Sequence, residues 1–448
     1  MNTETFKTTI LINLVVISLF LTYSLWTIKP PLNAVQSQKY IQDVPTMTKK
    51  EIANLIAPYR ILYHKENTHI ATEQSAYVNA MYNALEKGEF QDFKDISTKV
   101  DKNAFLSFVH GKDKLEIVFP TEIPFDTIKK VQTIKEKNVS DYSFDRIVIS
   151  FQGMHDDDIK TYFVSYDTQK IYEMTLKNIS VKDLENLRDQ YVLKSGIEYT
   201  EYATNENHAI FLPKENVEMP RMLYVTSKLQ EDVFRDSLFN DTRYVKKDTS
   251  EIEDSYTDGT RLMRISKGTQ MLTYMNPSIT NTIYDDGTLV QKSIDYTNNH
   301  GGWSDTYHFY SMNAREGKTT FRLYADNSYP VFSSSGMATL QQVWGNEEPS
   351  LYNRPLFKLS FRGEYEKTEL PSGTSVISLL EKMKDANMNQ ITNIQIGYEM
   401  NPESNTNNVQ VSAVRLEPIW IISYGNTYKK LDWNQNNGGG ALVGLEQN

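Results

Sequence analysis

The sequence predicts an α+β protein in which an N-terminal transmembrane helix precedes a multi-domain extracytoplasmic body with mostly antiparallel sheets. Three observations support this fold class. Residues 8–28 contain no charged side chain, and roughly 20 apolar residues suffice to cross a bilayer as a helix. Short strand-like segments separated by turns dominate the rest of the chain, with few amphipathic helices among them. The chain has 448 residues, and the part beyond the apolar run exceeds what one hydrophobic core usually supports.

The apolar run has the features of an uncleaved anchor. It is longer than the core of a signal peptide, which has roughly 7–15 residues, and no small-residue cleavage site follows it. Lys29, Pro30 and Pro31 come next instead. Residues 1–7 form a tail too short to be a domain, so we expect them in the cytoplasm. The sequence therefore predicts a single-pass protein of the cell membrane with its body outside.

Composition limits the kinds of partner that the body can bind. The formal net charge is −10, and the chain contains no cysteine. An acidic body argues against binding to nucleic acid or docking on anionic lipid, since both favour a cationic face. Without cysteine there is no disulfide framework, no thiolate metal site and no cysteine nucleophile.

After a polar spacer over residues 29–47, residues 48–194 are expected to form an N-terminal α+β domain. Thr48 and Glu51 have the spacing of a capping box, which predicts a helix over residues 49–57 that ends before Pro58. The other expected elements are strands at 59–63, 115–119, 146–151, 161–165 and 171–176, a helix over 73–86, and a helix capped by Ser180.

Two further domains are expected. The first, residues 195–337, is strand-rich, and Asp258–Gly259 and Asp285–Thr288 are predicted as its hairpin turns. The second, residues 338–433, is an α+β domain with one helix over 375–388. A glycine- and asparagine-rich segment, residues 434–448, is predicted as a disordered tail. The strands expected in these domains lie at 208–212, 222–226, 262–265, 271–274, 356–361, 391–399, 409–417 and 419–424, and a helix at 229–239.

No residues point to catalysis, to a cofactor or to a metal. His64 and His69 are five apart and lack the H-E-x-x-H spacing that places two zinc ligands on one helix face. His300 to His308 is the densest group of polar and aromatic residues. It predicts either a glycine turn with an exposed tryptophan or histidine, or an extracytoplasmic ligand-binding loop. A weaker rival is a cell-wall hydrolase with an unrecognised site.

The anchor with LTYSLWTIKP (residues 21–30), the three-part body and VRLEPIWIISYGNTYKKL (residues 414–431) together resemble the YycH family. The resemblance covers essentially the whole chain. It implies a membrane-anchored, non-enzymatic regulator of the sensor histidine kinase WalK (YycG) in the WalK/WalR two-component system of Gram-positive bacteria. It also implies a YycI-like companion protein, a later part of the body similar in fold to that companion, and an effect on cell-wall metabolism. It brings no active-site residues.

A single-span protein without an enzyme site can reach a kinase in the membrane only through its helix or its body. Within the helix, Leu14, Ser18, Thr22 and Trp26 lie at four-residue steps on one stripe. Ser18 and Thr22 form a small-x-x-x-small pair, and Asn13 is a polar group that gains by bonding to another helix. These five residues are the predicted partner-binding positions. The alternative is that the hydroxyls bond their own helix backbone.

Overall fold

A computed structural model describes residues 3–27, 47–156, 158–205, 208–280, 283–363, 366–383, 386–404, 411–425, 427–434 and 439–447. The chain divides into two compact units, Met1–Gln42 and Asp43–Asn448. The second unit is called the body below. Nearly all of the predicted spacer, residues 29–46, lies outside the described residues.

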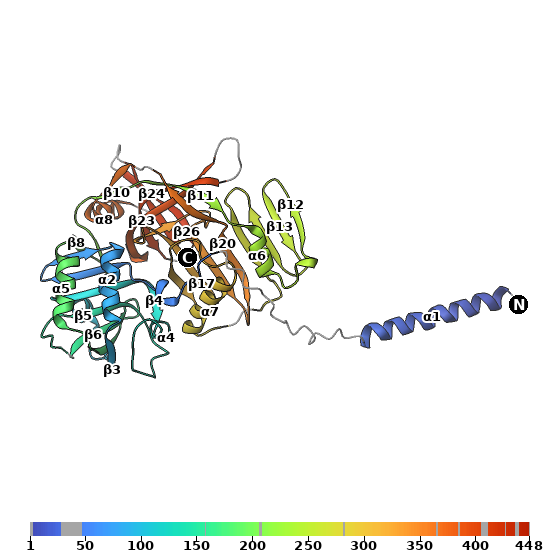
Figure 1. The fold of residues 1–448 in the computed structure, drawn as a ribbon, viewed down its shortest axis with the longest axis horizontal. Coiled ribbons are helices and arrows are strands. Elements are labelled where there is room, and N and C mark those ends of the chain that lie inside the picture. The colour runs from blue at the N-terminus through green and yellow to red at the C-terminus, as the bar shows by residue number, and fades with distance from the viewer. Residues whose placement is uncertain are drawn as a thin grey trace. The chain divides into compact units, whose positions relative to one another are not determined.

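The first unit consists of helix α1, Thr3–Thr27 (Figure 1). The helix begins inside the segment predicted as a tail and covers most of the predicted transmembrane run. Its described apolar side chains, such as Leu14 and Phe20, are 59% and 69% exposed. By length and hydropathy, none of the helices in the described part of the chain qualifies as a membrane span.

The first half of the body is a nine-stranded sheet in which all the paired strands run antiparallel. Its order is β3-β7-β6-β5-β4-β1-β2-β8-β9. β6 and β7 pair with Val164 opposite Ile171, which confirms the strands predicted at residues 161–165 and 171–176. The strands are β1 (Arg60–Lys65), β2 (Thr68–Thr72), β3 (Glu89–Asp95), β4 (Lys114–Pro124), β5 (Ser143–Ser150), β6 (Ile159–Ser165), β7 (Lys170–Lys177), β8 (Ile197–Asn205) and β9 (His208–Pro213).

Short helices cover this sheet, and α2 and α5 lie in front of it in Figure 1. α2 buries Val78, Met81, Tyr82 and Leu85 at helical spacing, which confirms the helix predicted there. The helical segments of this half are α2 (Ser75–Leu85), α3 (Phe105–Val109), α4 (Phe125–Ile128), α5 (Val181–Leu187), the 3₁₀ turns η1 (Ile52–Asn54) and η2 (Lys102–Ala104), and the π-helical turn η3 (Arg188–Leu193).

The helix predicted over residues 49–57 is wrong, because only the short turn η1 forms there. Thr48 makes a β-bridge with Trp303, and the backbone N–H of Lys50 donates to Asn298 Oδ1 at 2.9 Å. The N–H of Trp303 donates to the carbonyl oxygen of Thr48 at 3.1 Å, and Asn298 Nδ2 donates to that of Lys50 at 2.9 Å. These long-range bonds occupy carbonyl groups that a helix would have used.

The second half of the body is a fifteen-stranded sheet with one parallel pair among its described strands, β18 with β23. The sheets are thus mostly antiparallel, as predicted. A separate pair joins β10 (Val217–Pro220) to β22 (Lys367–Leu370). The large sheet contains β11 (Met222–Lys228), β12 (Lys246–Thr249), β13 (Glu253–Thr257), β14 (Leu262–Ser266), β15 (Met271–Met275), β16 (Tyr307–Asn313), β17 (Lys318–Ala325), β18 (Tyr329–Phe332), β19 (Thr339–Trp344), β20 (Pro349–Pro355), β21 (Phe357–Arg362), β23 (Ile391–Ser404), β24 (Val411–Tyr424), β25 (Thr427–Asn434) and β26 (Gly439–Gln447).

Sheet pairing crosses both of the domain boundaries drawn from the sequence. β8 and β9 lie beyond residue 194 but extend the first sheet. β17 pairs with β19 across residues 337 and 338, so this boundary falls inside one sheet. One hydrophobic cluster includes Phe144 of the first sheet and Phe321 of the second. Strand pairing between distant segments leaves no local signal, so these pairings could not be predicted from the sequence.

Two predicted elements at the C-terminal side of the chain are different in the structure. Asp285 to Thr288 is the start of a helix rather than a hairpin turn, because the Asp285 carboxylate accepts from the N–H of Thr288 as an N-cap. The segment predicted as a disordered tail contains β26, which pairs with β25. The remaining helical segments are α6 (Glu231–Leu238), α7 (Asp286–Asn299), α8 (Gly373–Lys382), η4 (Thr242–Tyr244) and η5 (Met388–Gln390).

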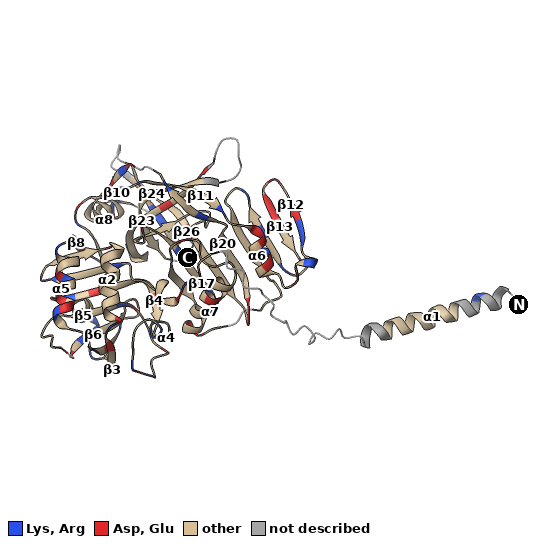
Figure 2. Ribbon diagram, in the orientation of Figure 1, with Lys and Arg blue, Asp and Glu red and all other residues tan. Residues whose placement is uncertain are grey.

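Charged side chains are dispersed over the body. In Figure 2, Lys and Arg as well as Asp and Glu are scattered over the strands and helices of the body.

Candidate functional site

Strand alternation gives the first sheet one apolar and one partly polar face. Tyr63 on β1 and Ile117 on β4 point into the main hydrophobic cluster. Leu62 and Glu116, which pair across the same two strands, lie on the opposite face. That face is where a group of buried polar side chains gathers.

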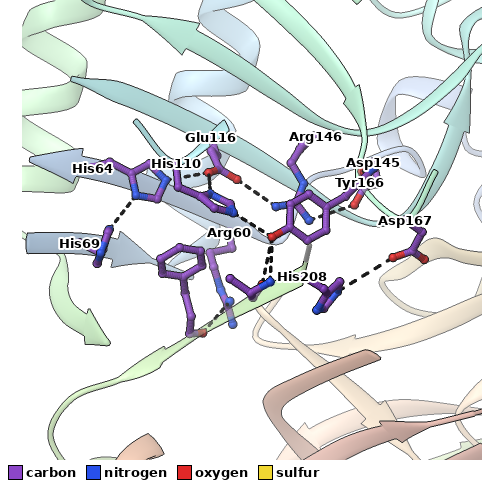
Figure 3. Close-up of polar contacts among 12 residues, drawn as sticks. Arg60, His64, His69, His110, Glu116, Asp145, Arg146, Tyr166, Asp167 and His208 are labelled. Atoms are coloured by element: carbon purple, nitrogen blue, oxygen red, sulfur yellow. Dashed lines mark hydrogen bonds and ion pairs between the residues drawn. The ribbon is translucent and has the colours of Figure 1, made fainter. Parts of the chain in front are cut away.

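Glu116 is the centre of this group, and its side chain is completely buried. Its Oε1 accepts from His64 Nε2 at 2.7 Å and from His110 Nδ1 at 2.5 Å. Its Oε2 accepts from Arg146 Nη1 at 3.0 Å. Figure 3 shows the carboxylate between the two imidazoles and the guanidinium. We call His64, His110 and Glu116 the histidine–glutamate cluster.

Each histidine of the cluster has a further partner on its other ring nitrogen. His64 Nδ1 lies 2.7 Å from Nδ1 of His69, its cross-strand neighbour in the β1–β2 hairpin. His110 Nε2 lies 2.8 Å from the hydroxyl of Tyr166. That hydroxyl accepts from the N–H of Ala209 at 3.0 Å and lies 3.3 Å from its carbonyl oxygen. Both imidazoles are therefore held at both nitrogens.

The electrostatics favour an ionised Glu116 beside a neutral His110. Burial alone would raise the pKa of Glu116, but His110 and His64 outweigh it and hold that pKa well below its usual range. Burial lowers the pKa of His110. Burial, followed by the influence of His64, lowers the pKa of His69 to about 4. The charge of Arg146 therefore balances that of Glu116 inside the protein.

A cavity of about 140 Å³ borders the cluster. Glu116, Arg146, Tyr166 and His208 are among its lining residues. The Arg146 guanidinium stacks on the Tyr166 ring at 3.6 Å and donates to Asp145 at 3.1 Å. The cavity thus has a polar wall that continues directly into the cluster.

The sequence analysis missed this cluster because it compared His64 and His69 only with a helical zinc motif. A signal was present: the two histidines are symmetric about Glu66–Asn67, and a two-residue turn there would make them cross-strand partners. His110 directly follows α3 and Glu116 lies on β4, and nothing in their spacing shows that they meet His64. The expectation of no metal site stays a prediction.

The segment from His300 to His308 is packed inside the body. His300 stacks on Tyr296 with ring centroids 3.7 Å apart, and Trp303 is 2% exposed. Trp303 Nε1 donates to Asn298 Oδ1 at 2.8 Å. Burial lowers the pKa of His308 to about 3. The expected exposed tryptophan is therefore wrong, and the packing gives no support to a ligand-binding loop.

The predicted partner-binding residues all fall within α1. Leu14 is exposed, and Thr22 Oγ1 donates to the carbonyl oxygen of Ser18 at 2.8 Å. This is the hydrogen bond to the helix backbone that the alternative expects for Thr22. The side chains of Ser18 and Thr22 remain small, so another helix could still approach α1 closely at these positions. Asn13 lies about 100° around the helix from Leu14, so it is not on the same stripe. The side chain of Trp26 lies outside the described part.

Comparison with known proteins gives matches along nearly the whole chain. The family described as YycH protein, N-terminal domain, matches residues 4–193, and YycH protein, C-terminal domain, matches residues 207–438. A relative from Bacillus subtilis (strain 168), described as two-component system WalR/WalK regulatory protein YycH, is 25% identical over 439 residues. That match covers 94% of this chain and 95% of the relative. The crystal structure of YycH from Bacillus subtilis matches with a TM-score of 0.72 and 23% identity, covering 89% of this chain and 97% of that one, which shows a common fold.

Proposed function

Because the chain belongs to the YycH family, we propose that it is a regulatory protein of a two-component system of the WalR/WalK type. The observation that carries the proposal is the similarity to a regulatory protein of that system over 94% of this chain. The family is regulatory, and the chain is not an enzyme. Its action on a kinase must therefore come from binding.

Regulation by binding requires a preference between two states of the kinase. A regulator that binds both states equally well shifts nothing, however tight the complex. The proposal is that this chain contacts a WalK-like sensor histidine kinase and favours one of its states. A YycI-like protein is the proposed third member of the complex, and cell-wall metabolism is the proposed output. Both come from the resemblance stated above.

The membrane anchor is part of the proposal. The uncharged run of residues 8–28 supports it, as does the helical form of residues 3–27. A helix of 25 residues is roughly 37 Å long at 1.5 Å per residue, and the hydrocarbon core of a bilayer is about 30 Å thick. The proposed arrangement is a single pass through the cell membrane with the body outside.

The stripe of Leu14, Ser18, Thr22 and Trp26 is the proposed contact with the kinase helices. Small side chains at four-residue spacing let two helices approach closely in lipid. Asn13, on another side of α1, is the proposed hydrogen-bonding position toward a second helix, which is the place for the YycI-like protein.

The test is cross-linked co-purification of the sensor kinase with the tagged full-length chain from membranes. Replacing the small residues, Ser18→Leu with Thr22→Leu, should reduce the recovered kinase several-fold because larger side chains keep the helices apart. The matched control is Val16→Leu with Phe20→Leu, which lies on the opposite side of α1 and should leave recovery unchanged. Equal recovery with both pairs would remove the helix contact from the proposal. Absence of the kinase from the wild-type sample would overturn the proposed function.

A further inference from the structure

We propose that the histidine–glutamate cluster is a zinc site, with His64 Nε2, His110 Nδ1 and Glu116 Oε1 as protein ligands. The three side chains are buried, and their ligand atoms all lie within 4.8 Å of one another. Two imidazole nitrogens with one carboxylate oxygen and an open fourth position form a set that suits Zn²⁺. This inference goes beyond the proposed regulatory function and does not depend on it.

The distances require only a small expansion of the cluster. Glu116 Oε1 lies 2.7 Å from His64 Nε2 and 2.5 Å from His110 Nδ1. In a tetrahedral site with bonds of about 2.0–2.1 Å, neighbouring ligand atoms are roughly 3.3 Å apart. The two pairs that include Glu116 must therefore each separate by less than about 1 Å, which small side-chain rotations provide. The three strands and helices that carry the ligands keep their places.

The outer partners of both histidines allow the required change of tautomer. Without zinc, His64 Nε2 and His110 Nδ1 each carry the proton that Glu116 accepts. For binding, each proton must move to the other ring nitrogen. His64 Nδ1–H can then donate to His69 Nδ1, 2.7 Å away, and His69 can carry its own proton on Nε2, which lies 3.7 Å from Glu201.

The same exchange is available on the other side of the cluster. His110 Nε2–H can donate to the Tyr166 oxygen, 2.8 Å away. The Tyr166 hydroxyl then turns to the carbonyl oxygen of Ala209, 3.3 Å away, and still accepts from the N–H of Ala209. Each of the three imidazoles keeps its number of protons, so the exchange itself releases no proton. Partners that hold the second nitrogen of a ligating histidine are typical of metal sites.

The surroundings of the Glu116 carboxylate also suit a bound cation. Arg146 holds Oε2 of Glu116, which leaves Oε1 directed at the two imidazoles. Asp145 pairs with Arg146 on its other side at 3.1 Å, and this negative charge partly compensates the added cation. Glu116 also lines the cavity of about 140 Å³, which is large enough to admit an ion and a water molecule.

The experiment titrates the purified full-length chain, first freed of metal with a chelator, with zinc chloride and measures stoichiometry and affinity by calorimetry. We expect one zinc ion per chain. His64→Gln and His110→Asn place an amide nitrogen where each ligand nitrogen stood. They keep the hydrogen bond to Glu116 but lose the ligand, and each should weaken zinc affinity about 100-fold or more. His155→Gln, at an exposed histidine, is the matched control and should bind as the wild type does.

X-ray absorption at the zinc edge of the wild-type chain keeps the test independent of how the variants fold. Two imidazoles in the first coordination sphere are expected. Less than one zinc per chain, a spectrum without imidazole ligands, or unchanged affinity in both ligand variants would overturn the zinc site and leave the cluster as a hydrogen-bonded structural element.

Discussion

At the scale of single residues, Glu122 is the side chain whose charge state most clearly sets the pH dependence of stability. Burial, together with the negative charge of Asp145, raises the pKa of Glu122 to about 7. The hydroxyl of Ser165 donates to its Oε1 at 2.5 Å. Between the unfolded pKa of 4.5 and the folded value, the folded chain binds the extra proton. Stability therefore falls as pH rises through this window.

Glu122→Gln should remove this loss of stability at high pH because the amide is neutral at every pH. The free energy of unfolding at pH 8 should rise by about 1–3 kcal/mol, and at pH 4 it should stay close to the wild-type value. Urea denaturation of the purified chain at both pH values measures the difference. Glu185→Gln, at an exposed position on α5, serves as control with no change expected. A less stable Glu122→Gln protein at pH 8 would show that Glu122 is needed as a carboxylate.

Of the contacts in the histidine–glutamate cluster and its surroundings, one could be predicted from the sequence and another could not. The pairing of His64 with His69 follows from a two-residue turn and was open to prediction. The contact of Glu116 with His110 was not, because it depends on how α3 packs on β4. Such contacts depend on tertiary packing, and no periodic pattern in the sequence indicates them.

At the scale of elements, β26 is the one whose role the sequence hides most completely. Its glycine-rich start is typical of disorder, yet the strand pairs with β25 from Gly439 to Gln447. Glu446 fixes its end: the carboxylate accepts from Arg322 Nη2 at 2.7 Å and from the N–H of Ser333 at 2.6 Å. Arg322 is 2% exposed, so its charge depends on this partner.

Glu446→Ala should destabilise the body by about 3–5 kcal/mol, because it leaves the buried guanidinium of Arg322 without its counter-charge. Chemical denaturation of the full-length chain measures this change. Glu251→Ala, at an exposed position, should change stability by less than about 0.5 kcal/mol. An equally small effect of Glu446→Ala would mean that β26 is held by its backbone pairing alone.

Elements with a strong local pattern were predicted well. Elements whose residues are typical of two different structures were not. The apolar spacing of α2 and the alternation of β6 and β7 identify them without tertiary information. Asp285 with Gly287 fits both a hairpin turn and a helix start, and the structure shows the N-cap. Local chemistry alone does not separate these two uses of aspartate and glycine.

At the scale of the whole molecule, one hydrophobic cluster runs through both sheets of the body. The mixture of helices and strands and the mostly antiparallel sheets were predictable from turns and alternation. The joining of fifteen strands between β11 and β26 into one sheet was not, because it depends on pairs such as β17 with β19.

The most direct test of the regulatory proposal is the output of the WalK-like kinase, measured as the phosphorylated fraction of its response regulator, in cells with and without this chain. Deletion should change the output, and the full-length chain should restore it. Restoration by residues 1–33 alone would place the contact in α1, whereas restoration only by the body on an unrelated anchor would place it outside the membrane. A kinase output that does not respond to deletion would contradict the regulatory function.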